Sequence, residues 1–139
     1  MNPATRDDVT KQSFEALSEF RCELRRFLRF SEVAARSEGI TLSQYLLLLH
    51  IKGSPGREWA TISELAERLQ AAPKAVVGLV SHCEAAGLVA LRRSDTDYGQ
   101  VEVHLQVRGE RSLTRLAALY KTELKTLDPV FKVSKLKEP

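Results

Sequence analysis

The apolar residues near the start of the chain recur with the period of an α-helix. From about Lys11 to Ser37, apolar positions are spaced three or four residues apart and form a stripe. Arginines and glutamates alternate between them, several at i,i+4 spacing, which is typical of an exposed helix face. Gly39 supplies the left-handed residue that commonly ends a helix. Because so long a helix exceeds what a small globule can cover, we expect part of its stripe to meet a second subunit.

A second helix is expected directly after Thr41. Thr41 and Gln44 form a capping box, and the following LSQYLLLLHI is apolar nearly all round, as in a helix at the middle of a core. The Gly53-Ser54-Pro55-Gly56 segment predicts its end. The next residues, REWAT, are expected to be short and extended. Trp59 in this segment could anchor the base of a following hairpin or line a cleft.

The segment from Thr61 to Leu105 has the pattern of two helices, a tight turn and a β-hairpin. Thr61 and Glu64 form another capping box, and Pro73 suits the first position of the second helix. That helix has a core-facing stripe at i, i+3, i+4 and i+7, formed by Val76, Leu79, Val80 and Cys83. Gly87 caps the helix. Residues 88–93 and 100–107 predict two strands, the second with strict alternation, joined by a tip at 94–99. This order predicts a winged helix-turn-helix.

A second long helical stripe is expected after Gly109, ended by Pro129 and followed by a short amphipathic turn that includes Phe131, Val133 and Leu136. The chain is therefore interpreted as one domain, residues 1–139, that is mainly α with a small β-hairpin wing (α+β). Residues 11–38 and 108–139 form the long N- and C-terminal helices, and residues 41–107 form the winged helix-turn-helix.

Composition excludes several other classes of protein. A chain of 139 residues is long enough for one domain with its own core. Cys22 and Cys83 match no metal-site spacing, and no phosphate-binding glycine loop or catalytic triad pattern is present, so we expect no metal, no cofactor and no enzyme. The first residues have no apolar leader core, and no run approaches the roughly 18 apolar residues of a membrane span. We therefore expect a cytoplasmic protein with no membrane partner.

The positive charge is not where a DNA-binding lobe would need it. The net charge is +3, and residues 113–139 carry six basic against three acidic residues. Residues 61–112 carry six basic against seven acidic residues. A basic footprint on the reading lobe is the usual electrostatic signature of DNA binding, so the balance favours DNA binding only if the charges cluster on one face.

Five segments, in this order and spacing, resemble the MarR family of bacterial winged-helix regulators: FRCELRRFLRFSE, GITLSQYLLLLHI, TISELAERL, LVSHCEAAGLV and VEVHLQVRGE. The resemblance covers nearly the whole chain. It implies a homodimer joined through the first and last helices, a pseudo-palindromic double-stranded DNA operator and, in many members, a small-molecule effector or oxidant that weakens DNA binding. The chain departs from the family at KAVVG, where members carry Ser, Thr and basic residues, and at the wing tip, where members commonly have arginines.

The DNA contacts expected from this reading lie on the second helix and the wing. The helix positions that avoid the core stripe include Lys74, Ala75, Val77, Gly78, Ser81 and His82. Of these, Lys74, Ser81 and His82 offer hydrogen bonds, whereas Ala75 and Val77 offer only methyl groups to thymine. Gly78 either allows the helix to approach another backbone closely or marks a position where the requirement for a particular side chain is relaxed. Arg92 and Arg93 reach phosphate or pair with Asp95 or Asp97, and Ser63 holds a phosphate or is simply solvated.

The resemblance also assigns residues to a dimer interface and to a ligand cleft. The expected interface residues are Phe14, Leu17, Leu116, Tyr120, Leu124 and Phe131. The expected cleft residues, each of a type also common in a core, are Phe27, Phe30, Tyr45, His50 and Trp59. Cys22 lies in the first helix, as does the reactive cysteine of peroxide-sensing members; the alternative is a packed or idle thiol. Cys83 is expected to be structural.

The sequence thus predicts a homodimeric, sequence-specific DNA-binding transcriptional regulator, a repressor that occludes a promoter. The alternative is a dimeric effector-binding or protein-interaction module on the same fold with weakened DNA binding.

Overall fold

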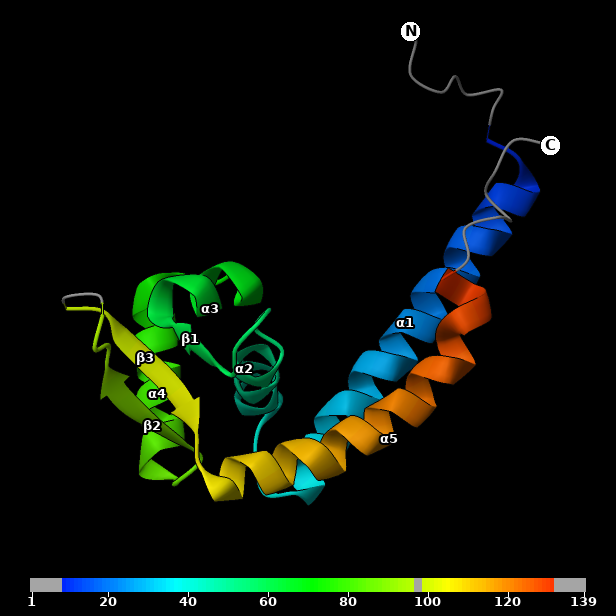
Figure 1. Cartoon of the computed structure of the whole chain (residues 1–139). Coiled ribbons are helices and arrows are strands. Elements are labelled where there is room, and N and C mark those ends of the chain that lie inside the picture. Colours follow the sequence, from blue (N-terminus) through cyan, green and yellow to red (C-terminus); the bar gives the residue numbers. More distant parts are fainter. Residues whose placement is uncertain (1–8, 97–98, 132–139) are drawn as a thin grey trace, which may run out of the picture.

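The computed structural model describes residues 9–96 and 99–131 and has an elongated arm joined to a compact head. The arm consists of α1 (Lys11–Ser37) and α5 (Val107–Phe131), which run side by side in opposite directions (Figure 1). The head contains the remaining elements: α2 (Leu42–Lys52), β1 (Trp59–Thr61), α3 (Ile62–Leu69), α4 (Pro73–Ala85), β2 (Val89–Arg93) and β3 (Val101–Leu105). The predicted fold class, mainly helical with a small wing, is confirmed.

Local capping signals begin the helices where the sequence predicts. The Thr41 N–H donates to Gln44 Oε1 at 2.9 Å, and the Gln44 N–H donates to Thr41 Oγ1 at 3.1 Å. Thr61 and Glu64 form the same reciprocal box at the start of α3. Pro73 is the first residue of α4, where its missing N–H needs no partner. Gln70 (φ 54°) ends α3 in the left-handed conformation, a feature that the sequence did not reveal.

The wing is part of a three-stranded antiparallel sheet with the order β1-β3-β2. Trp59 pairs with His104 across β1 and β3, and Arg92 pairs with Glu102 across β2 and β3. The extended REWAT segment therefore supplies the third strand, next to the hairpin. The hairpin strands are shorter than the expected ranges 88–93 and 100–107, and the end of the second range already belongs to α5.

One expectation about the last helix, its end at Pro129, was wrong. Gly109 lies in the first turn of the helix, where an added Cβ would collide with the Leu88 carbonyl oxygen. The glycine thus permits close packing of α5 on the start of the wing. Pro129 does not end the helix, which continues to Phe131; so close to the end, a proline removes only one hydrogen bond of the ladder. The expected final turn at Val133 and Leu136 lies outside the described residues.

The core of the head is centred on α2. Leu47, Leu48 and Ile51 are fully buried, as the nearly all-apolar sequence of this helix predicts. Around it pack buried side chains from every other part of the head and from α5: Leu65, Val76, Val80, Cys83, Leu88, Val103 and Leu116. Full burial of each such side chain contributes about 1.5–3 kcal/mol. The α2 helix therefore fixes the relative positions of α3, α4 and the sheet.

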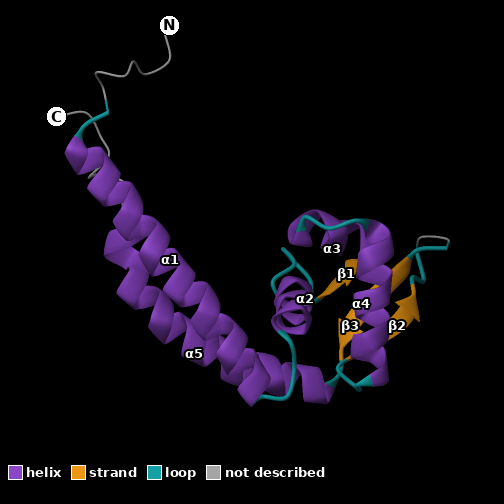
Figure 2. Ribbon diagram, turned by 180° about the vertical axis from the view of Figure 1, so that it is seen from behind, coloured by secondary structure: helices purple, strands orange, loops and turns teal. Residues whose placement is uncertain are grey.

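The head is joined to the arm through the first half of α5. Arg108 Nη1 donates to the Ala86 carbonyl at the end of α4, at 3.0 Å, and Lys52 Nζ lies 2.6 Å from Glu110 Oε1. Further along the arm, the Tyr120 hydroxyl donates to the Ser31 carbonyl of α1 at 2.6 Å, in a buried position. Seen from behind, α5 passes without interruption from the base of the head into the arm (Figure 2).

Candidate nucleic-acid interface

The α4 helix presents the six predicted reading residues to solvent. Lys74, Ala75, Val77, Gly78, Ser81 and His82 are all exposed. On the opposite side of the helix, the side chains of Val76, Val80 and Cys83 are at most 2 % exposed. The predicted division of α4 into a core face and an outer face is therefore present. What the outer face binds does not follow from this division alone.

Within that face, four residues form one stripe along the helix. Lys74, Val77, Gly78 and Ser81 stand at i, i+3, i+4 and i+7 and so lie one above the other. The polar side chains are at the ends of this set, and the centre is apolar. Val77 is 54 % exposed, and a Cβ added at Gly78 would meet nothing within 4 Å outside its own segment of helix.

The wing places two arginines beside this helix. Arg92 and Arg93 are exposed residues of β2, and within the described part of the chain neither forms an ion pair, with Asp95 or with any other carboxylate. Asp97, the other expected partner, lies outside the described residues. Arg92 stands opposite Glu102, but the carboxylate of Glu102 contacts His104 Nε2 instead, at 2.8 Å. Both guanidinium groups are therefore available to an external anion.

The base of the wing is held by an aromatic and ionic cluster. The ring of Trp59 stacks on His104 with centroids 6.2 Å apart, and the Arg57 guanidinium lies 4.0 Å above the Trp59 ring. Arg57 also forms an ion pair with Glu64. The pKa of Glu64 is lowered mainly by the hydrogen bond from the Thr61 backbone N–H, and to a smaller extent by Arg57. Trp59 thus anchors the wing base, the first of its two expected roles. Ser63, in the first turn of α3, is exposed near this cluster.

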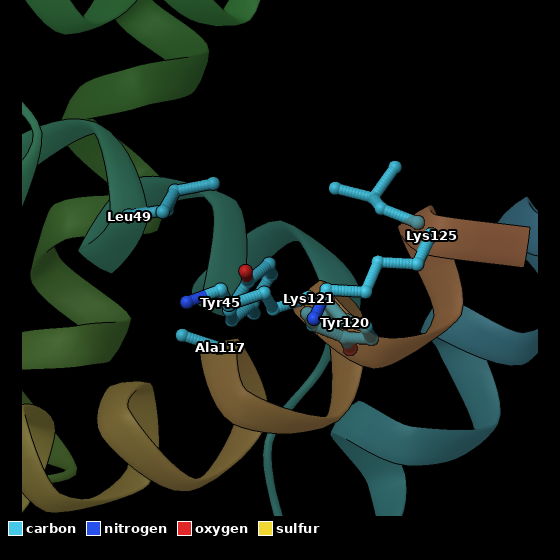
Figure 3. Close-up of a pocket in the computed structure, with 7 residues that line it drawn as sticks. Tyr45, Leu49, Ala117, Tyr120, Lys121 and Lys125 are labelled. Atoms are coloured by element: carbon cyan, nitrogen blue, oxygen red, sulfur yellow. The ribbon is translucent and has the colours of Figure 1, made fainter. Parts of the chain in front are cut away.

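A cavity lies between α2 and α5, at the junction of head and arm. It has a volume of about 620 Å³, and side chains of the two helices line it (Figure 3): Tyr45, Leu49, Ala117, Tyr120, Lys121, Leu124 and Lys125. Only Tyr45 belongs to the predicted cleft set. Burial, followed by the neighbouring Tyr120, raises the pKa of Tyr45 to about 12, so its hydroxyl stays neutral at physiological pH. The cavity combines apolar walls with two lysine side chains.

The other predicted cleft residues lie elsewhere. Phe27 and Phe30 pack edge-on against the ring of Tyr120, with centroids 6.4 and 6.0 Å away, and do not line the cavity. His50 lines a separate polar cavity of about 660 Å³ with Arg57 and Arg68. Burial, and then the charge of Arg68, lowers the pKa of His50, so this ring is neutral at pH 7. The predicted set is corrected accordingly: one member lines the cavity between head and arm.

The predicted dimer residues divide into an exposed and a buried group. Phe14, Leu17 and Leu124 are 60 %, 47 % and 45 % exposed, which leaves apolar surface along the arm. Leu116 and Tyr120 are only 0 % and 4 % exposed, because they pack in the core of their own chain. These two side chains therefore have almost no surface left for a second subunit. Phe131 ends α5, and its side chain lies outside the described residues.

The two cysteines have opposite environments. Cys83 is buried, and burial raises the pKa of its thiol to about 11, so the thiol stays protonated and unreactive near neutral pH. Cys22 is exposed on α1, so it is not packed in the core. Among the described residues, no group of three or more His, Cys, Asp or Glu could hold a metal ion, and no helix is both long and apolar enough to cross a membrane.

Sequence reasoning missed the α5 side of the cavity. Four of its residues have i, i+3, i+4 and i+7 spacing, which predicts that they share one face of the helix: Ala117, Tyr120, Lys121 and Leu124. That this stripe faces Tyr45 and Leu49 depends on how the arm leaves the head, which no local pattern encodes. The contact of Arg57 with Trp59 and Glu64 was missed for the same reason.

Comparison with known proteins agrees with this fold. The MarR family model matches residues 38–97. AbsC, a MarR family transcriptional regulator from Streptomyces coelicolor, has a TM-score of 0.70 at 18 % identity, over 94 % of this chain and 84 % of that one. A MarR family protein from Bacillus stearothermophilus has a TM-score of 0.72 at 20 % identity, over 86 % and 83 %. A mutant of MepR from S. aureus, bound to an oligodeoxyribonucleotide, has a TM-score of 0.65 at 18 % identity, over 79 % of each chain.

No curated protein gives a significant match in sequence. AbsC, a member of the matching family, is a transcriptional regulator, in agreement with the prediction that the chain is not an enzyme. The predicted resemblance is confirmed: the chain has the MarR winged-helix fold, and its segment from residue 38 to residue 97 matches the MarR family.

Proposed function

We propose that this chain is a homodimeric, sequence-specific DNA-binding regulator of transcription in the cytoplasm. The observation that carries the proposal is the two-sided α4 helix, with Val76, Val80 and Cys83 buried on its inner face and six exposed residues on its outer face. A winged helix of this kind places its second helix in the major groove. Arg92 and Arg93 on the adjacent wing have no ion-pair partner among the described residues and suit contacts with phosphate, which supply affinity and register.

Dimerisation is proposed to occur along the arm. Phe14, Leu17 and Leu124 leave exposed apolar surface there, and exposed apolar surface in a soluble protein commonly marks an interaction site. A two-fold axis along the arm would present two α4 helices to one face of DNA, one helical turn apart, so the operator would be a pseudo-palindrome. A dimer bound across a promoter would repress by occlusion.

The cavity between α2 and α5 is the proposed effector site. Its apolar walls and the ammonium groups of Lys121 and Lys125 suit a small apolar molecule that carries a negative charge. Because the cavity is lined by one helix of the head and one of the arm, a ligand there would change their relative orientation. Such a change would alter the spacing of the two α4 helices and so the affinity for DNA.

Binding of the purified protein to the DNA directly upstream of its own gene tests the proposal. A salt series with that fragment and with random DNA of equal length separates specific from nonspecific affinity. We expect at least about a 1,000-fold preference for the upstream fragment, within the usual range for specific binders, together with a linear loss of affinity with log salt. Equal, weak binding to both fragments would reject the proposal.

A second candidate is a dimeric effector-binding or protein-interaction module whose DNA contacts are weakened. The observations that favour it are the acidic excess within residues 61–112 and the apolar centre of the α4 stripe. This candidate predicts that the protein binds a small apolar anion at the cavity but has no preferred DNA sequence. Both functions predict anion binding at the cavity, so the salt series distinguishes them: only the first function predicts tighter binding to the upstream fragment than to random DNA.

A further inference from the structure

The centre of the α4 stripe has no side chain that can make a hydrogen bond. Val77 and Gly78 occupy it, between Lys74 on one side and Ser81 on the other. The residues near the start of a recognition helix are those that meet base edges. The side chains at this level of the helix can therefore offer a base only an apolar contact. The one apolar group that any base offers in the major groove is the C5-methyl group of thymine.

Gly78 shows that the chain itself does not need this space. Glycine is the poorest helix former after proline, yet it stands in the middle of a 13-residue helix. A Cβ at this position would meet no neighbouring element of the chain within 4 Å, and the residue has an ordinary helical backbone. Neither packing nor a positive φ accounts for the glycine. A missing side chain on an outer face does, however, allow a partner to approach the helix backbone closely.

The charges around the stripe favour DNA as that partner. Lys74 is exposed at the start of α4, and the exposed Arg92 and Arg93 of the wing have no ion-pair partner among the described residues. Lys74 lies at one end of the apolar strip and the exposed Glu84 lies one turn beyond Ser81 at the other, so the cationic end is the start of α4. That end is the part of a recognition helix that meets base edges, with phosphates close by.

We infer that Val77 is a specificity-determining residue that contacts the C5-methyl group of a thymine in each half-site, and that Gly78 lets α4 approach closely enough for this contact. The inference rests on the proposed DNA-binding function and deepens it. It identifies the preferred DNA as one with a thymine at the centre of the half-site. The hydrogen-bonding groups of Lys74 and Ser81 lie one turn away on either side.

The test begins with the half-site itself. The full-length protein is used to select binding sequences from a random duplex library, which yields the preferred half-site. Each thymine of that half-site is then replaced, one at a time, by deoxyuridine, which lacks only the methyl group and keeps every hydrogen-bonding group. We expect one thymine per half-site whose replacement weakens binding about fourfold, the effect of one buried methyl group.

The Val77→Ala variant assigns the contact to its residue. In this variant the loss caused by deoxyuridine at that position should shrink to nearly onefold, because the partner of the methyl group is gone. Val107→Ala is the matched control, since Val107 is a 68 % exposed helical valine in the first turn of α5. The control should retain the full fourfold loss.

The Gly78→Ala variant tests the close approach. Alanine favours a helix over glycine, so the melting temperature of the free protein should rise by a few degrees. Affinity for the selected site should nevertheless fall at least about fivefold, because the new methyl group occupies space needed by DNA. Thr114→Ala, at an exposed site in α5, controls for a gain in helix propensity alone and should leave the affinity unchanged.

The outcomes distinguish a failure of the inference about Val77 and Gly78 from a failure of the proposed DNA-binding function. A clear selected half-site, with no methyl effect or with one that persists in Val77→Ala, overturns the methyl contact and leaves the DNA-binding function standing. Unchanged or tighter binding by Gly78→Ala overturns the close approach. Failure to select any sequence overturns the proposed function and the inference together.

Discussion

The head buries most of its large apolar side chains within one chain, whereas the arm leaves a stripe of its own exposed. In the head, α2, α3 and α4 each have side chains that are covered almost completely, for example Leu48 and Leu65 at 0 % exposure. In the arm, Phe14 and Leu17 on α1 and Leu124 on α5 keep about half of their surface in contact with water. The two regions have the same kind of amphipathic helix but a different supply of neighbours.

This difference indicates which part of the fold has enough neighbours to close a core. In the head, α2 packs against α3, α4, the sheet and the first half of α5, so its buried residues are covered within one chain. The arm has only two antiparallel helices, and two helices cover only one side of each other. The exposed residues of the arm therefore mark where a second copy would complete the structure, and the predictions below are ordered by the size of the expected effect.

The largest effect is expected in the core of the head. Leu65→Ala removes a fully buried side chain and leaves a cavity, which lowers the free energy of unfolding by about 2–5 kcal/mol. Urea unfolding followed by circular dichroism measures this loss. Leu91→Ala is the control, because Leu91 is 43 % exposed and its truncation should change the stability by less than about 1 kcal/mol. Equal losses in both variants would contradict the closed core.

The next effect concerns the assembly rather than the fold. The double variant Phe14→Glu/Leu17→Glu introduces two charges into the apolar stripe of the arm, and we expect it to convert a dimer to a monomer. Sedimentation velocity measures the mass, and circular dichroism shows that the helices remain. Gln12→Glu adds a charge at an exposed position on the opposite side of α1 and should leave the dimer intact. A double variant with the mass of a dimer would place the interface elsewhere.

A smaller effect is expected where α5 meets α1. Tyr120→Phe removes the hydroxyl that donates to the Ser31 carbonyl at 2.6 Å, in a buried setting. The lost hydrogen bond and the unpaired carbonyl together lower the stability by about 1–2 kcal/mol. Thermal unfolding measures the change. A variant as stable as the parent would mean that water replaces the hydroxyl.

The smallest effect concerns thiol chemistry. The raised pKa of Cys83, about 11 because of burial, means that its thiolate becomes important only in strongly alkaline solution. Since the folded pKa exceeds that of the unfolded chain, this thiol favours the folded state at neutral pH, and the contribution is lost as the pH rises from about 9 to about 11. At pH 8, a thiol reagent should modify Cys22 quickly and Cys83 only after unfolding. Rapid modification of both would show that the head opens locally.

The features that could be predicted from the sequence are those written in short-range patterns. The capping boxes at Thr41 and Thr61 each need only four residues, and the inner stripe of α4 needs only helical spacing. The features that could not be predicted depend on distant partners. Gly109 lies against the Leu88 carbonyl of a distant segment, and the Trp59 ring is contacted by Arg57 and by His104 of β3.

The candidate site divides in the same way. The exposure of Lys74, Val77 and Gly78 follows from the periodicity of one helix, so the sequence was sufficient. The lining of the cavity between head and arm required the angle between α2 and α5, so four of its five predicted residues lie elsewhere. The exposed apolar surface of the arm is an intermediate case. The sequence predicted a stripe too long to cover, and only the structure could distinguish exposed Leu124 from buried Leu116.

The most direct test of the central claim, that the outer face of α4 contacts DNA, is the salt-dependent affinity of Lys74→Ala for the upstream fragment. Lys11→Ala, at an exposed lysine where α1 begins, is the control. We predict that Lys74→Ala weakens binding about tenfold, as expected for one good contact, and, if that contact is to phosphate, reduces the salt slope by about one, whereas Lys11→Ala changes neither. Identical affinity and slope in the parent and in Lys74→Ala would contradict the account.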